Sequence, residues 1–178
     1  MAIILAGIHS LTQHLQQLNS NPEAYRPKRC PHCGHAGVWS HGHYLRLPDR
    51  ENSGPDSLNP IPILRFFCPQ AGCRRSCSAL PECIPPRRWY LWSVQQAMLL
   101  LLFTGQLSDE LLKPHVRTVW RWWARLKERF DSHRFCLCSR NALLGQYATV
   151  RAFWQACFEL MPFSSALFAV SRHDEDIP

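Results

Sequence analysis

Two cysteine motifs lie in the first half of the chain, with 34 residues between Cys33 and Cys68: Cys30-Pro31-His32-Cys33-Gly34 and Cys68-Pro69-Gln70-Ala71-Gly72-Cys73. A C-x-x-C turn places two thiolates on one side of a tight loop, and a following glycine can adopt the positive φ that the turn needs. We expect Gly72 to serve similarly inside the longer second motif. The four sulfurs have the spacing of a zinc ribbon, so Cys30, Cys33, Cys68 and Cys73 are predicted to bind one Zn²⁺.

Two strand-like runs, residues 38–46 and 61–67, lie between the motifs. Residues 48–60 separate them and are rich in Pro, Gly, Asn, Asp and Ser, which is the composition of a loop. The pattern predicts a β-hairpin that leads from one motif to the other. So small a ribbon can bury little apolar surface, so we expect the metal ion to stabilise it in place of an apolar core. We therefore expect the metal-free form to be largely unfolded.

Other residues near the motifs compete as ligands. Cys77 is the main rival and would replace one of the four cysteines. The remaining candidates are His32, His35, His41, His43 and Cys83. His41 and His43 alternate along the first strand and are interpreted as surface residues. Cysteines can also be small buried apolar residues, but that interpretation leaves the two separate Cys-Pro starts unexplained. Cys136, Cys138 and Cys157 show no second pair at metal spacing.

The second half of the chain has helical patterns. After Pro85 and Pro86, an apolar segment runs to Phe103 and is broken by Gly105. A short element at about residues 107–112 stops at Pro114, and a longer helix is predicted over residues 116–130. Three helices separated by Gly or Pro breaks are typical of a helix-turn-helix.

The helix predicted over residues 116–130 carries a basic row. Arg117, Arg121, Arg125 and Arg129 recur every four residues, while an apolar stripe recurs at spacings of four, three and four through Val119, Trp123, Leu126 and Phe130. A basic face beside a buried face is typical of a recognition helix, whose N-terminal half enters the major groove. The alternative is a solvated amphipathic helix with scattered arginines. Trp120 and Trp122 cannot both lie on the buried stripe.

The charge distribution favours a polyanionic partner. Residues 26–75 and 84–130 each carry eight Lys or Arg against three acidic residues, so the net charge of +7 lies in two blocks. Residues 1–7 are apolar but lack a positive flank, and the purely apolar run 97–103 is too short for a membrane span. We therefore expect a cytoplasmic protein without membrane contact, whose nine cysteines are reduced.

These patterns predict an α+β protein in four parts. Residues 1–25 hold an N-terminal helix at about residues 10–19 that packs on the ribbon, and residues 26–83 form the zinc ribbon. Residues 84–130 form the all-α helix-turn-helix domain. Residues 131–178 are a C-terminal helical extension with a frayed tail over residues 172–178.

The order of these parts resembles a known arrangement. The CPHCG motif, the HGHYLR and ILRFFC strands, the basic PPRRWYLW junction and the RTVWRWW helix occur in that order. This resembles the zinc-ribbon plus helix-turn-helix region of bacterial insertion-sequence transposases and small transposon-associated proteins, over about residues 25–130. Arg117-Thr118-Val119 followed by Arg121-Trp122 resembles the start of their recognition helix. The resemblance implies binding to double-stranded DNA, with Thr118 beside the four arginines, and a transposase or other element-encoded protein as a possible partner.

Catalysis is not expected. A strand-transfer domain uses three carboxylates to hold two metal ions, and the 48 residues after Phe130 offer Asp131, Glu159 and a tail cluster without strands to present them. The sequence contains no G-x-S-x-G, P-loop or H-E-x-x-H motif. Two hypotheses remain: a DNA-binding regulator or accessory end-binding factor of a mobile element, and a zinc-stabilised protein–protein adaptor. A single recognition helix reads few base pairs, so dimerisation or cooperation with the ribbon is compatible with DNA binding.

Overall fold

The computed structural model describes residues 2–49, 54–86, 90–108 and 114–171. The chain divides into two compact units, Met1–Leu91 and Trp92–Pro178. The N-terminal part predicted as 1–25 therefore shares a unit with the ribbon predicted as 26–83. The helical extension predicted as 131–178 shares the second unit with most of the helix-turn-helix region. The division falls after Leu91 rather than after residue 83.

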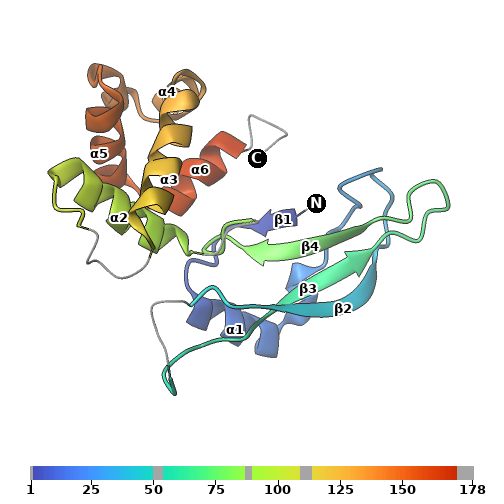
Figure 1. Ribbon diagram of the computed structural model, residues 1–178. Coiled ribbons are helices and arrows are strands. Elements are labelled where there is room, and N and C mark those ends of the chain that lie inside the picture. The colour runs from blue at the N-terminus through green and yellow to red at the C-terminus, as the bar shows by residue number, and fades with distance from the viewer. Residues whose placement is uncertain (1, 50–53, 87–89, 109–113, 172–178) are drawn as a thin grey trace. The chain divides into compact units, whose positions relative to one another are not determined.

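A four-stranded sheet forms the first unit (Figure 1). Its strands are β1 (Ala2–Leu5), β2 (Trp39–Arg46), β3 (Ile61–Phe67) and β4 (Ser76–Pro81), in the spatial order β1-β4-β3-β2. β2, β3 and β4 pair antiparallel, whereas β1 pairs parallel to β4. The hairpin of β2 and β3 matches the sequence prediction, and β1 and β4 extend it.

One irregularity shapes the exposed edge of this sheet. The register of β2 against β3 shifts between Ser40 and His43, so β2 contains a bulge. Gly42 lies in the bulge with φ 74°, a left-handed conformation that glycine adopts without steric cost. The bulge bends the outer strand, and a bent edge is a poorer template for pairing with another chain.

Helix α1 (Leu11–Ser20) and the 3-10 helix η1 (Pro22–Tyr25) complete the core of the first unit. The Ser10 hydroxyl caps α1 by accepting a hydrogen bond from the backbone N–H of Gln13 at 3.1 Å. Leu11 packs with Ile61 and Ile63 of β3 in one apolar cluster. The predicted packing of the N-terminal helix on the ribbon is confirmed, and the ribbon consequently has an apolar core besides its cysteines.

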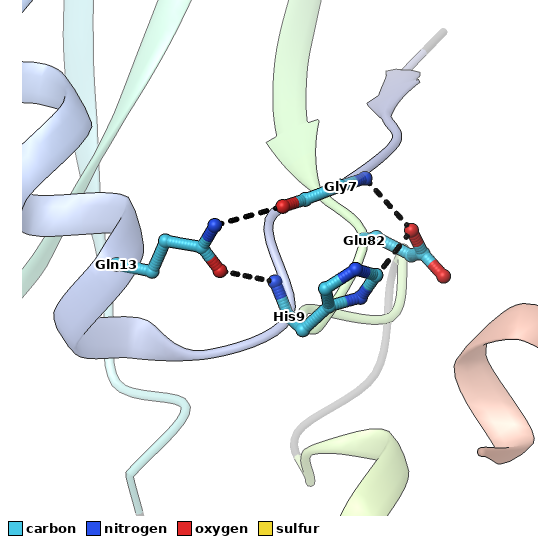
Figure 2. Close-up of polar contacts among 4 residues, drawn as sticks. All are labelled: Gly7, His9, Gln13 and Glu82. Carbon is cyan, nitrogen blue, oxygen red and sulfur yellow. Dashed lines mark hydrogen bonds and ion pairs between the residues drawn. The ribbon is translucent and has the colours of Figure 1, made fainter.

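The connection between β1 and α1 is fastened to the end of β4 (Figure 2). The buried carboxylate of Glu82 accepts a hydrogen bond from the backbone N–H of Gly7 at 3.1 Å and lies 3.7 Å from Nδ1 of His9. Gln13 spans the same loop, because its amide donates to the carbonyl of Gly7 and accepts from the N–H of His9. These contacts hold the short β1 strand in place at its C-terminal end.

The second unit is helical. Its elements are α2 (Trp92–Thr104), α3 (Val116–Glu128), α4 (Phe130–Cys138), η2 (Ala142–Gln146), α5 (Val150–Leu160) and α6 (Phe163–Ser171). Aromatic rings fill its core: Phe158 stacks on Phe103, and Trp154 meets Phe163 edge to face. The α+β class predicted from the sequence is confirmed.

The predicted helix-turn-helix is described only in part. Its first helix corresponds to α2. Most of the short second element, predicted at about residues 107–112, falls outside the described residues, as does the tail 172–178. The predicted third helix corresponds to α3, which ends at Glu128, two residues earlier than predicted; Arg129, at φ −103° and ψ 16°, separates it from α4, which begins at Phe130.

No single helix in the described ranges combines the length and the apolar composition needed to cross a membrane. Helix α5 and residues 163–170 of α6 have that length and composition only when taken together, and the pair is bent by 110° at the break between them.

Candidate metal centre

The first cysteine motif forms a tight turn at the start of the ribbon. The N–H of Gly34 donates to the carbonyl of Cys30 at 2.9 Å, and the N–H of Cys30 donates to the carbonyl of His35 at 2.8 Å. Gly34 has φ 74°, as the motif predicts. The backbone N–H of His32 points to Sγ of Cys30 at 3.4 Å. This turn presents both thiols of the motif on one side.

The second motif forms a similar turn between β3 and β4. The N–H groups of Cys73 and Arg74 both donate to the carbonyl of Gln70, at 2.9 and 3.0 Å, and Cys68 closes the turn by donating to the carbonyl of Arg75. The expectation for Gly72 is wrong, because Arg74 is the residue with positive φ, at 45°. Arg74 directly follows the second cysteine, as Gly34 does in the first motif.

The four predicted ligands meet in one cluster. The sulfurs of Cys30, Cys33, Cys68 and Cys73 all lie within 4.8 Å of one another. Cys30 Sγ is 3.8 Å from Cys73 Sγ, and Cys33 Sγ is 3.6 Å from Cys68 Sγ. In a tetrahedron with Zn–S bonds of about 2.3 Å, neighbouring sulfurs are about 3.8 Å apart. The cluster therefore fits a tetrahedral metal ion, and all nine cysteines of the chain are free thiols.

The electrostatics of the cluster favour a bound cation. Burial opposes the ionisation of Cys30, but hydrogen bonds from the N–H groups of His32 and Cys33 and from neighbouring thiols outweigh it and lower its pKa to about 7. Burial raises the pKa of Cys68 to about 12, and hydrogen bonds with the neighbouring thiols add to the rise. The Cys68 thiol is therefore expected to ionise at neutral pH only if a cation compensates its charge.

The rival ligands lie outside this cluster. Cys77 is buried in the apolar core, opposite Phe66 in the pairing of β3 with β4, and burial raises the pKa of its thiol. Cys83 belongs to a second apolar cluster, with Leu11 and Ile61. His41 packs its ring against that of Phe67, with centroids 5.7 Å apart. The clustered thiols are therefore those of Cys30, Cys33, Cys68 and Cys73, and Cys77 replaces none of them.

The arginine row, Arg117, Arg121, Arg125 and Arg129, lies in the second unit. All four side chains are exposed, whereas Thr118 is half-buried. The opposite face of α3 is buried through Val119, Trp122, Trp123 and Leu126. Trp120 is 51% exposed whereas Trp122 is buried, so these two tryptophans lie on different faces of α3, as their spacing requires. Trp123 anchors the helix, because its ring meets that of Phe103 in α2 edge to face at 5.0 Å.

A capping interaction at the start of α3 was not anticipated. Nδ1 of His115 accepts a hydrogen bond from the backbone N–H of Arg117 at 3.1 Å. The sequence offered only a weak signal for it, because His115 follows Pro114 and is not one of the common capping residues.

Comparisons of the chain with family models, with curated proteins and with solved structures find no match. The resemblance to transposase DNA-binding regions therefore rests on the sequence motifs alone.

Proposed function

We propose that this protein binds double-stranded DNA, as a regulator or accessory end-binding factor of a mobile genetic element. In this proposal a structural zinc ion joins the two cysteine turns of the first unit, and α3 of the second unit contacts the DNA. The observation that carries the proposal is the arginine row, exposed on a helix whose opposite face is buried. A transposase or another element-encoded protein is the expected partner.

Zinc is the metal that the ligand set favours. Four thiolates suit Zn²⁺, whereas carboxylate, carbonyl and water oxygens suit Mg²⁺ or Ca²⁺. Four protein ligands close the coordination sphere and leave no open position for water or a substrate. The ion would therefore cross-link residues 30–33 to residues 68–73 and would not catalyse a reaction.

The charge of α3 supports contact with DNA. Residues 116–129 contain the four arginines of the row and a single acid, Glu128. An arginine side chain can pair with a guanine edge in the major groove or with a phosphate, and both contacts need an exposed guanidinium on a firmly held helix. Val119 and Leu126 are buried and provide that hold.

A salt titration tests the proposal. The full chain is mixed with a fluorescent duplex of about 30 base pairs at about 50 and 200 mM salt, and fluorescence anisotropy reports binding. If the arginine row contacts phosphates, the logarithm of the affinity falls with the logarithm of salt, with a slope of about −0.9 per contact. Binding that is absent, or independent of salt, contradicts the proposal.

The adaptor hypothesis has one observation in its favour. Phe135 of α4 is 77% exposed and borders an open pocket of about 530 Å³ with Arg134 and Cys138. Exposed aromatic side chains beside a pocket are typical of protein-binding surfaces. If the chain does not bind DNA, this surface becomes the leading candidate for the functional site.

A further inference from the structure

An exposed aromatic side chain begins the outer strand of the ribbon. Trp39 is the first residue of β2, and its side chain is 61% exposed. Trp39 pairs with Phe67 on β3, and Phe67 pairs in turn with Ser76 on β4. Side chains of directly opposed residues in an antiparallel pair lie on the same face of a sheet. Trp39 and Phe67 therefore share one face, at the end of the sheet where β3 leads into Cys68.

Two side chains adjoin the Phe67 ring. The guanidinium carbon of Arg74 lies 5.7 Å from the centre of the ring, and the His41 ring packs against Phe67 from β2. We call Trp39, His41, Phe67 and Arg74 the ribbon face. It combines flat rings with the positive charge of Arg74.

The strands and cysteine turns that carry the ribbon face contain no acidic residue. Residues 27–47 and 61–81, which form β2, β3, β4 and both cysteine turns, include six Lys or Arg and four His but no Asp or Glu. These six cations outnumber the two net negative charges that four thiolates leave on a divalent ion. The surplus of positive charge suits a polyanion and opposes binding of a basic protein.

We propose that the ribbon face binds single-stranded nucleic acid, with an unpaired base stacked on Trp39 and a backbone phosphate held by Arg74. Bases in a duplex are already stacked on each other, so an exposed tryptophan gains a stacking partner only from an unpaired base. Cations beside an aromatic platform are the combination used for single strands. This site lies in the first unit and is independent of the duplex contact proposed for α3.

The test measures binding of the full chain to fluorescent oligothymidylate and oligouridylate of about 12 nucleotides by anisotropy. Loss of one stacked base lowers affinity roughly 5- to 150-fold, so Trp39→Ala is expected to bind that much more weakly and Trp39→Phe to keep most of the affinity. Leu45→Ala is the matched control, because Leu45 is an equally exposed apolar residue of the same strand, and its affinity should equal that of the parent.

The charge contribution is measured with Arg74→Gly, in which glycine suits the positive φ at position 74. Its salt slope for single strands should be smaller by about 0.7. Arg117→Ala/Arg121→Ala, which tests α3, should leave oligothymidylate affinity unchanged, so the two proposals fail separately. Comparing the two probes shows whether DNA or RNA is preferred. The inference is overturned if the parent binds neither probe, or if folded Trp39→Ala or folded Arg74→Gly binds both as the parent does.

Discussion

The backbone N–H of Gly7 donates a hydrogen bond to the carboxylate of Glu82, 75 residues further along the chain, at 3.1 Å (Figure 2). The N–H of Glu82 in turn donates to the carbonyl of Leu5 at 3.0 Å, so the two segments are joined in both directions. Strand β1 has only four residues and, among the described residues, pairs only with β4. These contacts therefore secure a strand that is too short to be stable by its own pairing.

Removing the Glu82 carboxylate should destabilise the first unit. Glu82→Ala leaves the N–H of Gly7 without its acceptor in a partly buried site, which costs about 1–3 kcal/mol in the free energy of unfolding. Glu82→Gln keeps an acceptor oxygen and should lose less. His9→Ala is the control, because His9 is exposed and its ion pair with Glu82 spans 3.7 Å. Urea unfolding of the three variants checks the order, and equal stability of Glu82→Ala and the parent would contradict it.

The buried His14 predicts a loss of stability in acid. Its Nδ1 meets the Tyr25 hydroxyl at 2.6 Å and its Nε2 meets the Pro62 carbonyl at 3.1 Å. Burial lowers its pKa below 6.5, although the bond to Pro62 opposes the shift. The unfolded chain therefore binds a proton before the folded chain does, and stability falls as pH drops below about 6.5, by at most about 1.4 kcal/mol per pH unit.

The contribution of His14 is isolated by comparison with His14→Gln. Other acid-sensitive groups, including the cysteine cluster, are present in both proteins, so the difference between their pH profiles belongs to position 14. The free energy of unfolding, measured at pH 7.5 and at lower pH, should fall more steeply with decreasing pH in the parent than in the variant. Parallel profiles would show that His14 does not titrate differently in the folded and unfolded chains.

Metal analysis should find one zinc ion per chain. Cys73→Ser removes one of the four clustered thiols and should lose the metal and lower the unfolding temperature of the first unit. Cys77→Ser is the matched control, because Cys77 lies nearby in the core but outside the cluster, and it should keep the metal at some cost in stability. A strong chelator should affect the parent as Cys73→Ser does. Loss of metal in Cys77→Ser but not in Cys73→Ser would establish the rival ligand set.

The cysteine cluster could be predicted because its geometry is largely local. Each pair of cysteines lies on one short turn, and the strands between the turns read clearly as β. Strand β4 could not be predicted from the same kind of pattern. Its sequence, Ser76-Cys77-Ser78-Ala79-Leu80-Pro81, resembles a loop, and its strand conformation depends on pairing with β3 on one side and β1 on the other.

The end of α3 was predicted to within two residues. The spacings of four and three residues correctly placed Val119, Trp123 and Leu126 on the buried face of the helix. No glycine or proline marks its end at Glu128, and the ring of Phe130, the first residue of α4, meets Phe153 of α5 edge to face at 5.3 Å. The positive φ of Arg74 was missed because glycine is the residue that sequence patterns associate with that conformation.

Affinity for duplex DNA should depend on the arginine row in two distinct ways. Arg117 and Arg121 lie in the N-terminal half of α3, the end that usually enters the major groove, so their loss should relax sequence preference and cost about 1–3 kcal/mol per base contact. Arg125 and Arg129 lie at the other end, where phosphate contacts are expected. Their loss should weaken all sequences alike and reduce the salt slope by about one unit each.

Alanine variants at each position, measured by anisotropy at two salt concentrations on random and selected duplexes, separate these outcomes. Long arginine stems can also cover the exposed Trp120, so every variant must first unfold at the parent's urea concentration. Lys127→Ala is the matched control, because Lys127 is a cation of the same helix whose ammonium lies 5.8 Å from the buried Trp123 ring, away from the row. If folded Arg117→Ala/Arg121→Ala bound DNA as tightly and as selectively as the parent, α3 would not be the reading helix, and the adaptor hypothesis would become the better account.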